Sequence, residues 1–502
     1  MRILKDRIVE AGLKDLVYVS YGQYSVDTQT RGIPRIEDAL KLSTRRVLYH
    51  MWKSVGTEKL IKAVPIVGEI VGRYHLVGDS SVYGAMATLA QGKAAFPLIW
   101  GKGNWGDLRN SKDPAAYRYT ECKAHPNLMN IVDDESMSRV GIMVPNFSDT
   151  TNEPYYIMSK IPLGLLNHTK GVVVGLTTEA PAHNVNEIID ASIAIIENGY
   201  DISSKNLAKY LKAPDHSLYD SYMIVDKNMW LDILETGKGT VQSCPKMELN
   251  DNIITVEALA YSGTYKQLEA MCLSIQDRMF KKHKKKVFKD CNNTTKLGKF
   301  GAKIILQGSS KKDSELFEEF YSLLVSKSMA NVRYSLTLCE QDAGEKPSLS
   351  DGSTYTTKTI GLKDFLIDFQ ERRRKFKLAA LQSKLEELKM LLDCEDLKLI
   401  LAKDSQKFLT LVTTSENTKM AIHSMVEKYK KSYEVCDRVL SNSGFSSYIN
   451  KSERIMQTIE RLEKDLKLTE HRIKHIDEYL IEELEQLKNK VGTKRVSEIK
   501  YL

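Results

Sequence analysis

The residue types with the clearest chemical potential lie in one segment, Ala115-Ala116-Tyr117-Arg118-Tyr119-Thr120-Glu121. A tyrosine hydroxyl has a pKa of about 10 and is a poor nucleophile at neutral pH. It can attack a phosphodiester if it loses its proton and if cations stabilise the equatorial oxygens of the pentacovalent transition state. Arg118 precedes Tyr119 directly and could supply one such cation. An Arg-Tyr pair alone is far more often a surface or packing feature, so this interpretation needs support from the rest of the chain.

A second block, Gly72 to Tyr83, has the pattern of a helix, a glycine turn and a new helix. Ser80 and Ser81 lie where the new helix begins, and free N–H groups at a helix start favour a DNA phosphate. His75 is a candidate proton carrier, although a single histidine after an apolar helix is more often structural. The other candidate cations of this region are Arg31, Lys41, Arg45 and Arg46.

The elements that must position these residues are short helices. Apolar spacings of three and four predict an amphipathic helix over Ile36–Trp52, with Lys41, Arg45 and Arg46 on its polar face. A second helix is predicted over Pro65–Tyr74, and a third, capped by Asp79 or Ser80, runs through Ala90. Helix, tight turn and helix form the outline of a helix-turn-helix, which many helical domains share.

The middle of the chain, residues 141–345, has mixed patterns. Strands are predicted over Gly171–Leu176, Asn252–Val256 and Val332–Thr337, where β-branched residues cluster or alternate. A basic run, Arg278–Lys286, admits two interpretations: a solvated helix or loop, and a surface that follows phosphates.

Two heptad-like series follow Leu362. Leucines step by three and four from Leu378 to Leu392, and Ile455–Leu480 repeats the pattern with a polar gap at Thr469. These series predict two coiled-coil arms. The stretch 393–450 must reverse the chain, so we expect an antiparallel hairpin with a small module at its tip.

Bulk composition limits the class of protein. The 502 residues predict about three domains, and 42% hydrophobic residues suffice for real cores. A net charge of +8 permits nucleic acid as a partner and fits an ordinary, slightly basic protein equally well. Seven scattered cysteines without zinc spacing indicate reduced thiols. Neither a membrane span nor a secretion signal is recognisable, which predicts a cytoplasmic protein.

Two small motifs are expected to do no chemistry. Gly101–Gly106 satisfies GxGxxG, but Asp107–Ser111 follows it in place of a helix, so a dinucleotide site is not expected. Asp133-Asp134-Glu135 lacks an Asp-x-Asp metal pattern, and we interpret it as a solvated turn. No metal site of the chain's own is predicted.

The order of several blocks resembles the breakage-reunion subunit of type IIA DNA topoisomerases, that is, the A subunits of DNA gyrase and topoisomerase IV. The resemblance covers nearly the whole chain. Its blocks are Arg31–Lys41, Arg45–Tyr49, His75–Tyr83, Gly103–Gly106, Arg118–Glu121, Lys160–Pro162, Gly171–Gly175, Pro181–Asn184, Leu480–Leu484 and Lys494–Arg495.

The resemblance implies roles for the candidate residues. Tyr119 would be the nucleophile that forms a 5′-phosphotyrosyl bond, and Arg118 would stabilise the phosphate. Arg31 and His75 would line the cleavage site. Lys41, Arg45 and Arg46 would hold the flanking DNA backbone. Val172 matches an isoleucine that wedges between base pairs, and a shorter side chain could change the bend.

The resemblance also implies a fold and partners. We expect an α+β, mostly helical chain: a winged-helix DNA-gate domain over 1–140, a mixed α/β tower over 141–345, and coiled-coil arms over 346–502 with a dimer gate near 393–450. The chain would form a homodimer on double-stranded DNA and join an ATPase partner in a heterotetramer. The resemblance implies that this partner would bind ATP and hold Mg²⁺. This sequence has no Walker A motif of its own.

Departures from the family pattern carry expectations of their own. His75-Leu76-Val77-Gly78-Asp79 stands where the family usually has His-Pro-His-Gly-Asp, and Thr44 replaces a common histidine or glutamine. Ser80 matches the serine beside quinolone drugs, but Gly84 replaces the usual acidic residue, which predicts weak quinolone sensitivity. No DNA-wrapping extension follows the second arm, which favours relaxation or decatenation over supercoiling. The short form resembles subunits of large bacteriophages, and a trimmed bacterial chain is the alternative.

Two other functions compete with the enzyme. One is a non-catalytic helix-turn-helix DNA-binding protein that dimerises through its coiled coil, and the other is a structural scaffold. The presence of a covalent DNA adduct separates the enzyme from both.

Overall fold

The structure is a computed structural model that describes residues 12–75, 78–296, 299–309, 312–341, 355–441 and 452–502. Predictions about the chain start, about Leu76 and Val77, and about part of 393–450 therefore concern residues outside the described ranges. The chain forms two compact units. One comprises residues 12–137, Gly141–Arg373 and Ile481–Leu502, and the other comprises Ser138–Val140 and Arg374–Leu480.

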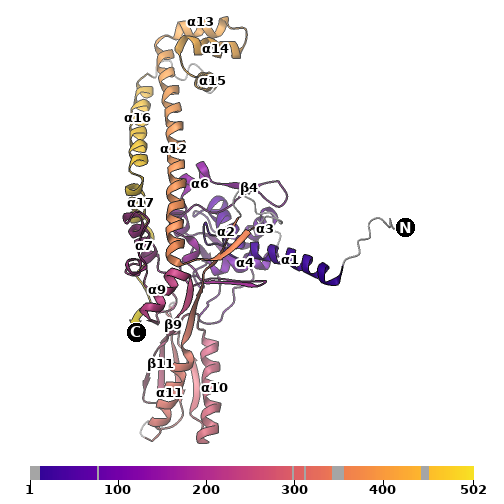
Figure 1. Cartoon of the computed structure of the whole chain (residues 1–502), viewed down its shortest axis with the longest axis vertical. Helices are drawn as coiled ribbons and strands as arrows, with labels where there is room; N and C mark the ends of the chain where they lie inside the picture. The colour runs from indigo at the N-terminus through magenta and orange to yellow at the C-terminus, as the bar shows by residue number, and fades with distance from the viewer. Residues whose placement is uncertain (1–11, 76–77, 297–298, 310–311, 342–354, 442–451) are drawn as a thin grey trace, which may run out of the picture. The chain divides into compact units, whose positions relative to one another are not determined.

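The N-terminal part of the first unit consists of helices, the longer of which Figure 1 labels, and a small sheet. Its longer helices are α1 (Leu13–Gly32), α2 (Leu42–His50, continued by a π-helical turn over Met51–Val55), α3 (Ala63–Arg73) and α4 (Asp79–Thr88). The sheet has the order β1-β3-β2, with β1 Ile61–Lys62, β2 Ile99–Lys102 and β3 Glu121–Ala124, all antiparallel. Val47 and Leu48 of α2 and Ile70 of α3 are fully buried, so apolar spacing fixes which helix faces turn inward.

The first predicted helix is partly wrong. It begins at Leu42 rather than Ile36, because Ala39 has a left-handed backbone (φ 54°) and the Leu40 N–H donates to Asp38 Oδ1 at 2.9 Å. The second prediction is confirmed within two residues by α3. The third helix exists as α4, but Gly78 is its N-cap and it ends at Thr88.

The acidic cluster at 133–135 is not a solvated turn. Asp133 is buried and caps α6 (Asp134–Val140) by accepting the Ser136 N–H at 3.1 Å. The preceding helix is α5 (Pro126–Ile131).

A six-stranded sheet forms the centre of the first unit, in the order β17-β8-β9-β14-β7-β6. β17 pairs with β8 in parallel, and the other pairs are antiparallel. The strands are β6 Thr169–Val173, β7 Leu176–Ala180, β8 Tyr222–Val225, β9 Lys238–Cys244, β14 Ala330–Ser335 and β17 Glu498–Tyr501. The buried strand predicted over Gly171–Leu176 is instead a hairpin, because Gly175 (φ 75°) turns the chain between β6 and β7.

Smaller elements complete this region. The strand predicted over Val332–Thr337 divides between β14 and the start of β15. The remaining elements are β4 Met143–Pro145, β5 Asn152–Pro154, η3 Leu163–Leu165, α7 Val185–Glu197, α8 Ser204–Leu207, α9 Lys227–Thr236, β15 Thr337–Gln341 and β16 Tyr355–Thr359.

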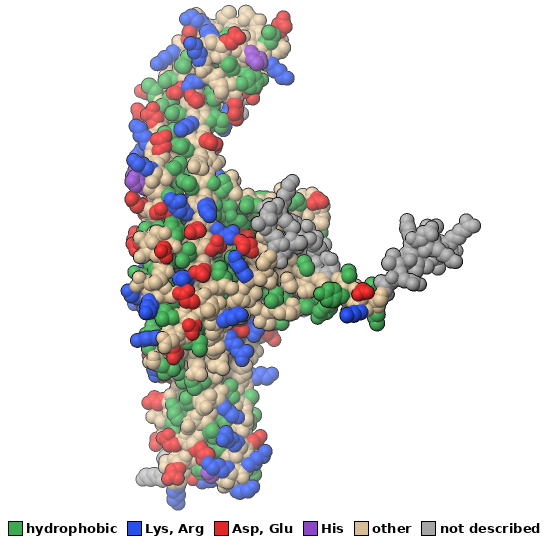
Figure 2. All heavy atoms as spheres, viewed as in Figure 1, with side chains coloured by type: hydrophobic (Ala, Val, Ile, Leu, Met, Phe, Trp, Pro, Cys, Tyr) green, Lys and Arg blue, Asp and Glu red, His purple; other side chains and the backbone are tan. Residues whose placement is uncertain are grey.

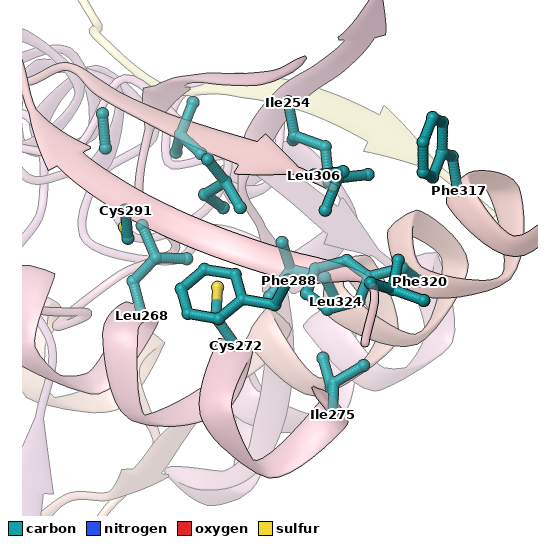
Figure 3. Packing of buried hydrophobic residues seen from close by; sticks show 14 of the residues in the cluster. Ile254, Leu268, Cys272, Ile275, Phe288, Cys291, Leu306, Phe317, Phe320 and Leu324 are labelled. Carbon is teal, nitrogen blue, oxygen red and sulfur yellow. The ribbon is translucent and has the colours of Figure 1, made fainter. Parts of the chain in front are cut away.

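A second sheet, β10-β11-β13-β12, is covered by α10 (Tyr265–His283) and α11 (Ser314–Ser328). Its strands are β10 Lys246–Asn250, β11 Ile253–Ala258, β12 Phe288–Asn293 and β13 Ala302–Leu306, so the strand predicted at 252–256 is confirmed. Figure 3 shows side chains of both layers meeting in one apolar core, in which the rings of Phe288 and Phe320 stack at 6.2 Å.

The second unit is helical. It contains most of α12 (Leu362–Lys403), then α13 (Ser405–Thr414), α14 (Thr418–Tyr429), α15 (Tyr433–Ser441), α16 (Ser452–Lys474) and the start of α17 (Ile476–Val491). Leu397, Phe408 and Met425 belong to a core of its own. The two helical series predicted from the sequence exist, and the second series breaks between α16 and α17.

Two further expectations concern the whole chain. All seven cysteines are free thiols, as predicted. Among the described residues, no helix is long and apolar enough to cross a membrane.

Candidate functional site

Tyr119 lies at the end of a turn that leads directly into β3. Its backbone N–H donates to the Ala116 carbonyl at 2.9 Å, and Thr120, the next residue, is fully buried. The Tyr119 side chain is 64% exposed, and its hydroxyl makes no hydrogen bond to any residue that the structure describes. The sheet therefore fixes the backbone of this residue while the phenol stays open to a substrate.

Two other tyrosines hold this turn against α4. The Tyr83 hydroxyl donates to the Ala115 carbonyl at 2.7 Å and lies 3.0 Å from Thr120 Oγ1. The Tyr117 hydroxyl donates to Asp79 Oδ2 at 2.8 Å, at the start of α4. These hydrogen bonds hold the chain in place on both sides of Tyr119.

The two tyrosines that flank Arg118 are therefore not equivalent. The hydrogen bond to Asp79 raises the pKa of Tyr117, which makes its phenolate harder to form. Burial raises the pKa of Tyr83. Tyr119 is the member of this trio whose hydroxyl is not already committed to a neighbour.

Arg118 lies over the ring of Tyr119, with its guanidinium carbon 4.7 Å from the ring centroid. This cation–π contact keeps a permanent positive charge beside the phenol. Both side chains are exposed. A phosphate that reached the Tyr119 hydroxyl would therefore meet a guanidinium at short range, as the adjacency in the sequence predicts.

His75 belongs to a different, buried group. Its Nδ1 accepts a hydrogen bond from Arg46 Nη1 at 3.0 Å, and Arg46 also makes two bonds to Glu153 at 2.6 and 2.7 Å. Burial and the charges of Arg46 and Arg31 lower the pKa of His75 to about 4. His75 is therefore neutral at neutral pH, and because Nδ1 is an acceptor, the ring proton lies on Nε2.

Arg31 lies in the last turn of α1, within electrostatic reach of His75. The end of α1 meets the β6 strand closely: a Cβ on Gly32 would come within 2.3 Å of Val173 Cγ1. Glycine at this position thus lets α1 approach the hairpin that carries Val172.

The predicted polar face of α2 is wrong for its two arginines, because both are buried. Arg45 makes a bidentate ion pair with Asp38 at 2.6 and 2.8 Å and donates to the Leu40 carbonyl at 2.9 Å. Arg46 is occupied by Glu153 and His75. These contacts give both arginines a structural role in the frame around the site, and a direct contact with DNA stays a prediction.

Lys41 lies at the edge of an open cavity of about 480 Å³. Its Nζ donates to the Lys170 carbonyl at 2.8 Å, and burial lowers its pKa. The cavity wall also includes Thr44, Ser81 and Lys93, so it joins the start of α2, α4 and the β6 strand. Ser80 and Ser81 are both exposed, and the Ser81 hydroxyl donates to the Gly78 carbonyl at 2.9 Å.

Val172 lies near the tip of the β6–β7 hairpin, opposite Thr177, and is 70% exposed. Most of this side chain is therefore open to solvent, and its wedging between base pairs stays a prediction.

Comparison with known proteins places this arrangement in a family. Residues 31–488 match the family model that describes the A subunit of DNA gyrase/topoisomerase IV. The chain belongs to this gyrase/topoisomerase IV family of A subunits. The resemblance found in the sequence is thereby confirmed.

Individual relatives agree with this membership of the gyrase A family. The A subunit of DNA topoisomerase 4 from Neisseria gonorrhoeae is 28% identical over 417 residues, which is 77% of this chain and 53% of the relative. The DNA gyrase A subunit of Brachyspira hyodysenteriae is 25% identical over 510 residues, 99% of this chain and 58% of the relative. The DNA gyrase A subunit of Spiroplasma citri is 38% identical over 189 residues, 37% of this chain and 82% of the relative. The chain thus spans little more than half the length of the first two relatives.

The residues around Tyr119 do not form a magnesium site of this gyrase A family member. The nearest carboxylate along the chain, Glu121, pairs with Lys62 at 2.9 Å and Lys102 at 3.5 Å. The described residues include no cluster of three His, Cys, Asp or Glu side chains that could hold a metal ion. A Mg²⁺ ion needs free oxygen ligands, so these side chains alone do not fit it.

The sequence pattern identified most of these residues as candidates. It missed the side chains that hold the Tyr119 turn and those that neutralise the buried arginines. Tyr83 and Asp79 stand inside the shared block His75–Tyr83, and Tyr117 directly precedes the shared block Arg118–Glu121, yet nothing in their spacing joined them. Asp38 and Glu153 were also missed. A buried arginine is generally expected to have a carboxylate partner. Which carboxylate it is depends on the fold, since Glu153 lies 107 residues from Arg46 along the chain.

Proposed function

We propose that this chain is the DNA-cleaving and religating subunit of an ATP-dependent type II DNA topoisomerase. One observation carries the proposal: the exposed phenol of Tyr119 lies beside the Arg118 guanidinium on a turn that hydrogen bonds at Ala115, Tyr117 and Thr120 hold in place. Membership of the gyrase A family supports it.

The proposed chemistry is a reversible transesterification. Tyr119 Oη loses its proton and attacks the phosphorus of one DNA strand. The P–O bond to the 3′ oxygen breaks, the 3′-hydroxyl leaves, and a 5′-phosphotyrosyl bond forms. The reverse attack by the 3′-hydroxyl releases Tyr119 and reseals the strand, so no net bond energy is lost.

Neighbouring side chains have separate tasks in this proposal. The Arg118 guanidinium donates to the equatorial phosphate oxygens as charge develops on them. Neutral His75 offers Nε2–H as a hydrogen-bond donor, and Arg31 supplies a second charge near it. Lys41, Ser80 and Ser81 contact the flanking DNA backbone, and Val172 wedges between base pairs. Arg45 and Arg46 support this surface through their buried ion pairs.

The architecture follows the family expectation. Residues 1–140 form a winged-helix DNA-gate domain, and the β1-β3-β2 sheet with α2, α3 and α4 supports this assignment. Residues 141–345 form the tower. Residues 346–502 form coiled-coil arms with a dimer gate near 393–450, supported by the long helix α12 and the separate core around Phe408.

The chain works as a homodimer that joins two copies of a second protein in an A₂B₂ complex on double-stranded DNA. This ATPase partner binds ATP and holds Mg²⁺. Two staggered cuts, one per Tyr119, open a gate for a second duplex, and relaxation or decatenation results.

A cleavage assay with the ATPase partner, supercoiled DNA and Mg²⁺ tests the proposal. Tyr119→Phe should abolish the covalent protein–DNA adduct and leave DNA affinity within about twofold, because only the reacting oxygen is removed. Tyr117→Phe is the matched control and should still form adduct. Adduct that persists in Tyr119→Phe would contradict the proposal. DNA binding without adduct from the parent chain would favour the non-catalytic helix-turn-helix protein.

A further inference from the structure

The strand β17 is an open edge of the six-stranded sheet. It pairs with β8 on one side, and no other strand that the structure describes pairs with its outer side. Glu498 and Leu502 donate their N–H groups to carbonyls of β8 at 3.0 Å. Because alternate residues of a parallel strand face its neighbour, Ile499 and Tyr501 direct their N–H and C=O groups away from β8. Such a row of unpaired backbone groups can accept another strand.

A small pocket lies where α9 meets the C-terminal strand (Figure 1). Its volume is about 240 Å³, and its lining includes Trp230, Leu231 and Tyr501. The indole N–H of Trp230 donates to the Leu211 carbonyl at 2.9 Å, so the polar group of this buried side chain is already satisfied. Tyr501 is 52% exposed. The pocket therefore suits an apolar side chain that is brought to it from outside.

Three exposed lysines surround this pocket, namely Lys205, Lys209 and Lys227. None of them forms an ion pair with a residue in the described part of the chain. Lys209 Nζ donates to the Asn206 side-chain oxygen at 2.9 Å, and Lys227 Nζ lies 5.5 Å from the ring centroid of Tyr501. Neither contact neutralises a charge, so the rim of the pocket stays positive.

Carboxylates near these lysines do not line the pocket. Asp226 accepts the N–H groups of Asn228 and Met229 at 2.8 and 3.0 Å and so caps α9. Glu235 pairs with Lys363 at 2.9 Å. Over most of the face that Figure 2 shows, basic and acidic side chains are mixed. A lysine rim without its own carboxylate therefore points to an anionic ligand.

The chemistry of the edge and of the pocket together favours a peptide over a nucleic acid. A peptide backbone carries alternating N–H and C=O groups, which match the outward groups of Ile499 and Tyr501. Phosphate oxygens only accept hydrogen bonds, so they cannot satisfy the outward carbonyls. In a strand added to this edge, one apolar side chain could enter the pocket, and carboxylates two residues away would lie on the same face, towards the lysines.

We propose that the outer edge of β17, with the lysine-rimmed pocket beside it, binds an extended acidic peptide segment of a partner protein by strand addition. The main-chain hydrogen bonds would supply affinity, and the pocket and the lysines would select an apolar residue between two acidic ones. This site goes beyond the proposed function, because it requires neither chemistry at Tyr119 nor a contact with DNA.

Binding of a labelled synthetic peptide to the full chain tests the site. The peptide Thr-Glu-Thr-Phe-Thr-Glu-Thr places its phenylalanine and both glutamates on one face of a strand. Fluorescence anisotropy should show saturable binding with a Kd below about 1 mM. The same peptide with glutamine in place of both glutamates should bind about tenfold more weakly at low salt. Absence of saturable binding by the glutamate peptide would overturn the proposal.

Backbone methylation separates strand addition from attraction by charge alone. One peptide is N-methylated at the phenylalanine, and another at the threonine that follows it. Only one of these two N–H groups can face β17, so one peptide should lose binding and the other should keep it. Equal affinities of the two methylated peptides would contradict strand addition. This comparison changes only the peptide, so it does not depend on how well any variant of the chain folds.

Variants of the chain locate the site. Lys209→Glu/Lys227→Glu should weaken binding of the glutamate peptide at least about tenfold at low salt. Ile499→Pro removes an outward N–H without removing a bond to β8 and should weaken binding about fivefold. The control Lys464→Glu/Lys467→Glu reverses two exposed charges on α16 and should change affinity less than about twofold. Equal losses in the two lysine variants would overturn the assignment.

Two further measurements separate this site from the proposed function. Tyr119→Phe should bind the peptide as the parent chain does, so a failed cleavage proposal would leave the peptide result standing. Duplex DNA should not displace the peptide. Displacement by duplex DNA, together with weaker DNA binding in Lys209→Glu/Lys227→Glu, would overturn the peptide site in favour of a nucleic-acid contact.

Discussion

The Tyr119 turn and the His75 cluster use similar residue types in opposite ways. On the turn, hydrogen bonds from Tyr83 and Tyr117 hold the backbone while the Tyr119 side chain stays exposed. In the cluster, the side chains of His75, Arg46 and Glu153 bond to one another in the interior. The first arrangement keeps a reactive group available, and the second keeps a charge pattern rigid. Burial, more than residue type, therefore separates the proposed nucleophile from the side chains that support it.

Removal of a carboxylate from the buried frame should give the largest effect. Asp38→Ala should lower the free energy of unfolding by about 3–5 kcal/mol, because it leaves the Arg45 charge buried without its partner. Denaturant unfolding of the full chain measures the change. Arg118→Ala, at an exposed position, should stay within about 0.5 kcal/mol. Similar losses of unfolding free energy in Asp38→Ala and Arg118→Ala would contradict the conclusion that the buried ion pairs stabilise the fold more than the exposed turn does.

As the pH falls, the His75 cluster should lose stability before the carboxylates of the protein are protonated. The folded pKa of His75, about 4, lies below its usual value of about 6.5, so the unfolded chain binds the proton more readily. Stability from this residue is complete above about pH 6.5 and is lost as the pH falls towards 4. Between pH 7 and pH 4, protonation of His75 in the unfolded chain should lower the free energy of unfolding by about 3 kcal/mol.

His75→Gln provides the comparison for that measurement, since glutamine can accept the Arg46 bond but does not titrate. The burial that lowers the pKa of His183 and His216 to about 3 acts in both proteins and cancels. A variant that loses as much stability as the parent between pH 7 and pH 4 would show that His75 is not protonated on unfolding.

The anchor of the turn should affect rate more than stability. Tyr117→Phe removes the bond to Asp79 and should lower the free energy of unfolding by less than about 1 kcal/mol, because the bond is exposed. It should slow adduct formation about tenfold, since small displacements of a nucleophile are costly. Asp79→Asn keeps an oxygen acceptor and should slow the reaction less. Parent-like rates in Tyr117→Phe would show that the bond does not position Tyr119.

The smallest predicted effect concerns quinolone drugs. Gly84 is exposed, and a Cβ there would meet no atom within 4 Å, so Gly84→Asp should fold normally. It restores the acidic residue expected four positions after Ser80 and should lower the drug concentration needed for stabilised cleavage several-fold. Gly84→Ala should leave that concentration unchanged. Strong drug-stabilised cleavage by the parent chain would contradict the prediction.

Local patterns predicted the elements well and long-range pairing poorly. Apolar spacing predicted α3, and β-branched residues predicted β11, because an element that buries one face has a matching pattern of apolar residues in the sequence. The helix expected from Ile36 fails where Asp38 accepts a backbone N–H and Ala39 turns left-handed. The strand expected over Gly171–Leu176 fails because Gly175 permits a hairpin turn.

The candidate site shows the same difference between local patterns, which the sequence predicted, and long-range pairing, which it did not. Arg118 and Tyr119 were recognisable because adjacent residues share one turn. The buried positions of Arg45 and Arg46 were not recognisable, since a helix periodicity assigns charges to the solvent unless a partner carboxylate is known. The anchors Tyr117 and Asp79 lie 38 residues apart and meet only after α4 packs beside the turn.

The most direct measurement is the identity of the residue that carries DNA after cleavage. The full chain, its ATPase partner, Mg²⁺ and a duplex labelled at the 5′ phosphate would be denatured during turnover, digested with protease and examined by mass spectrometry. The account predicts the nucleotide on Tyr119 alone, with Tyr117 unmodified. A nucleotide on Tyr117, or on no tyrosine of this chain, would contradict it.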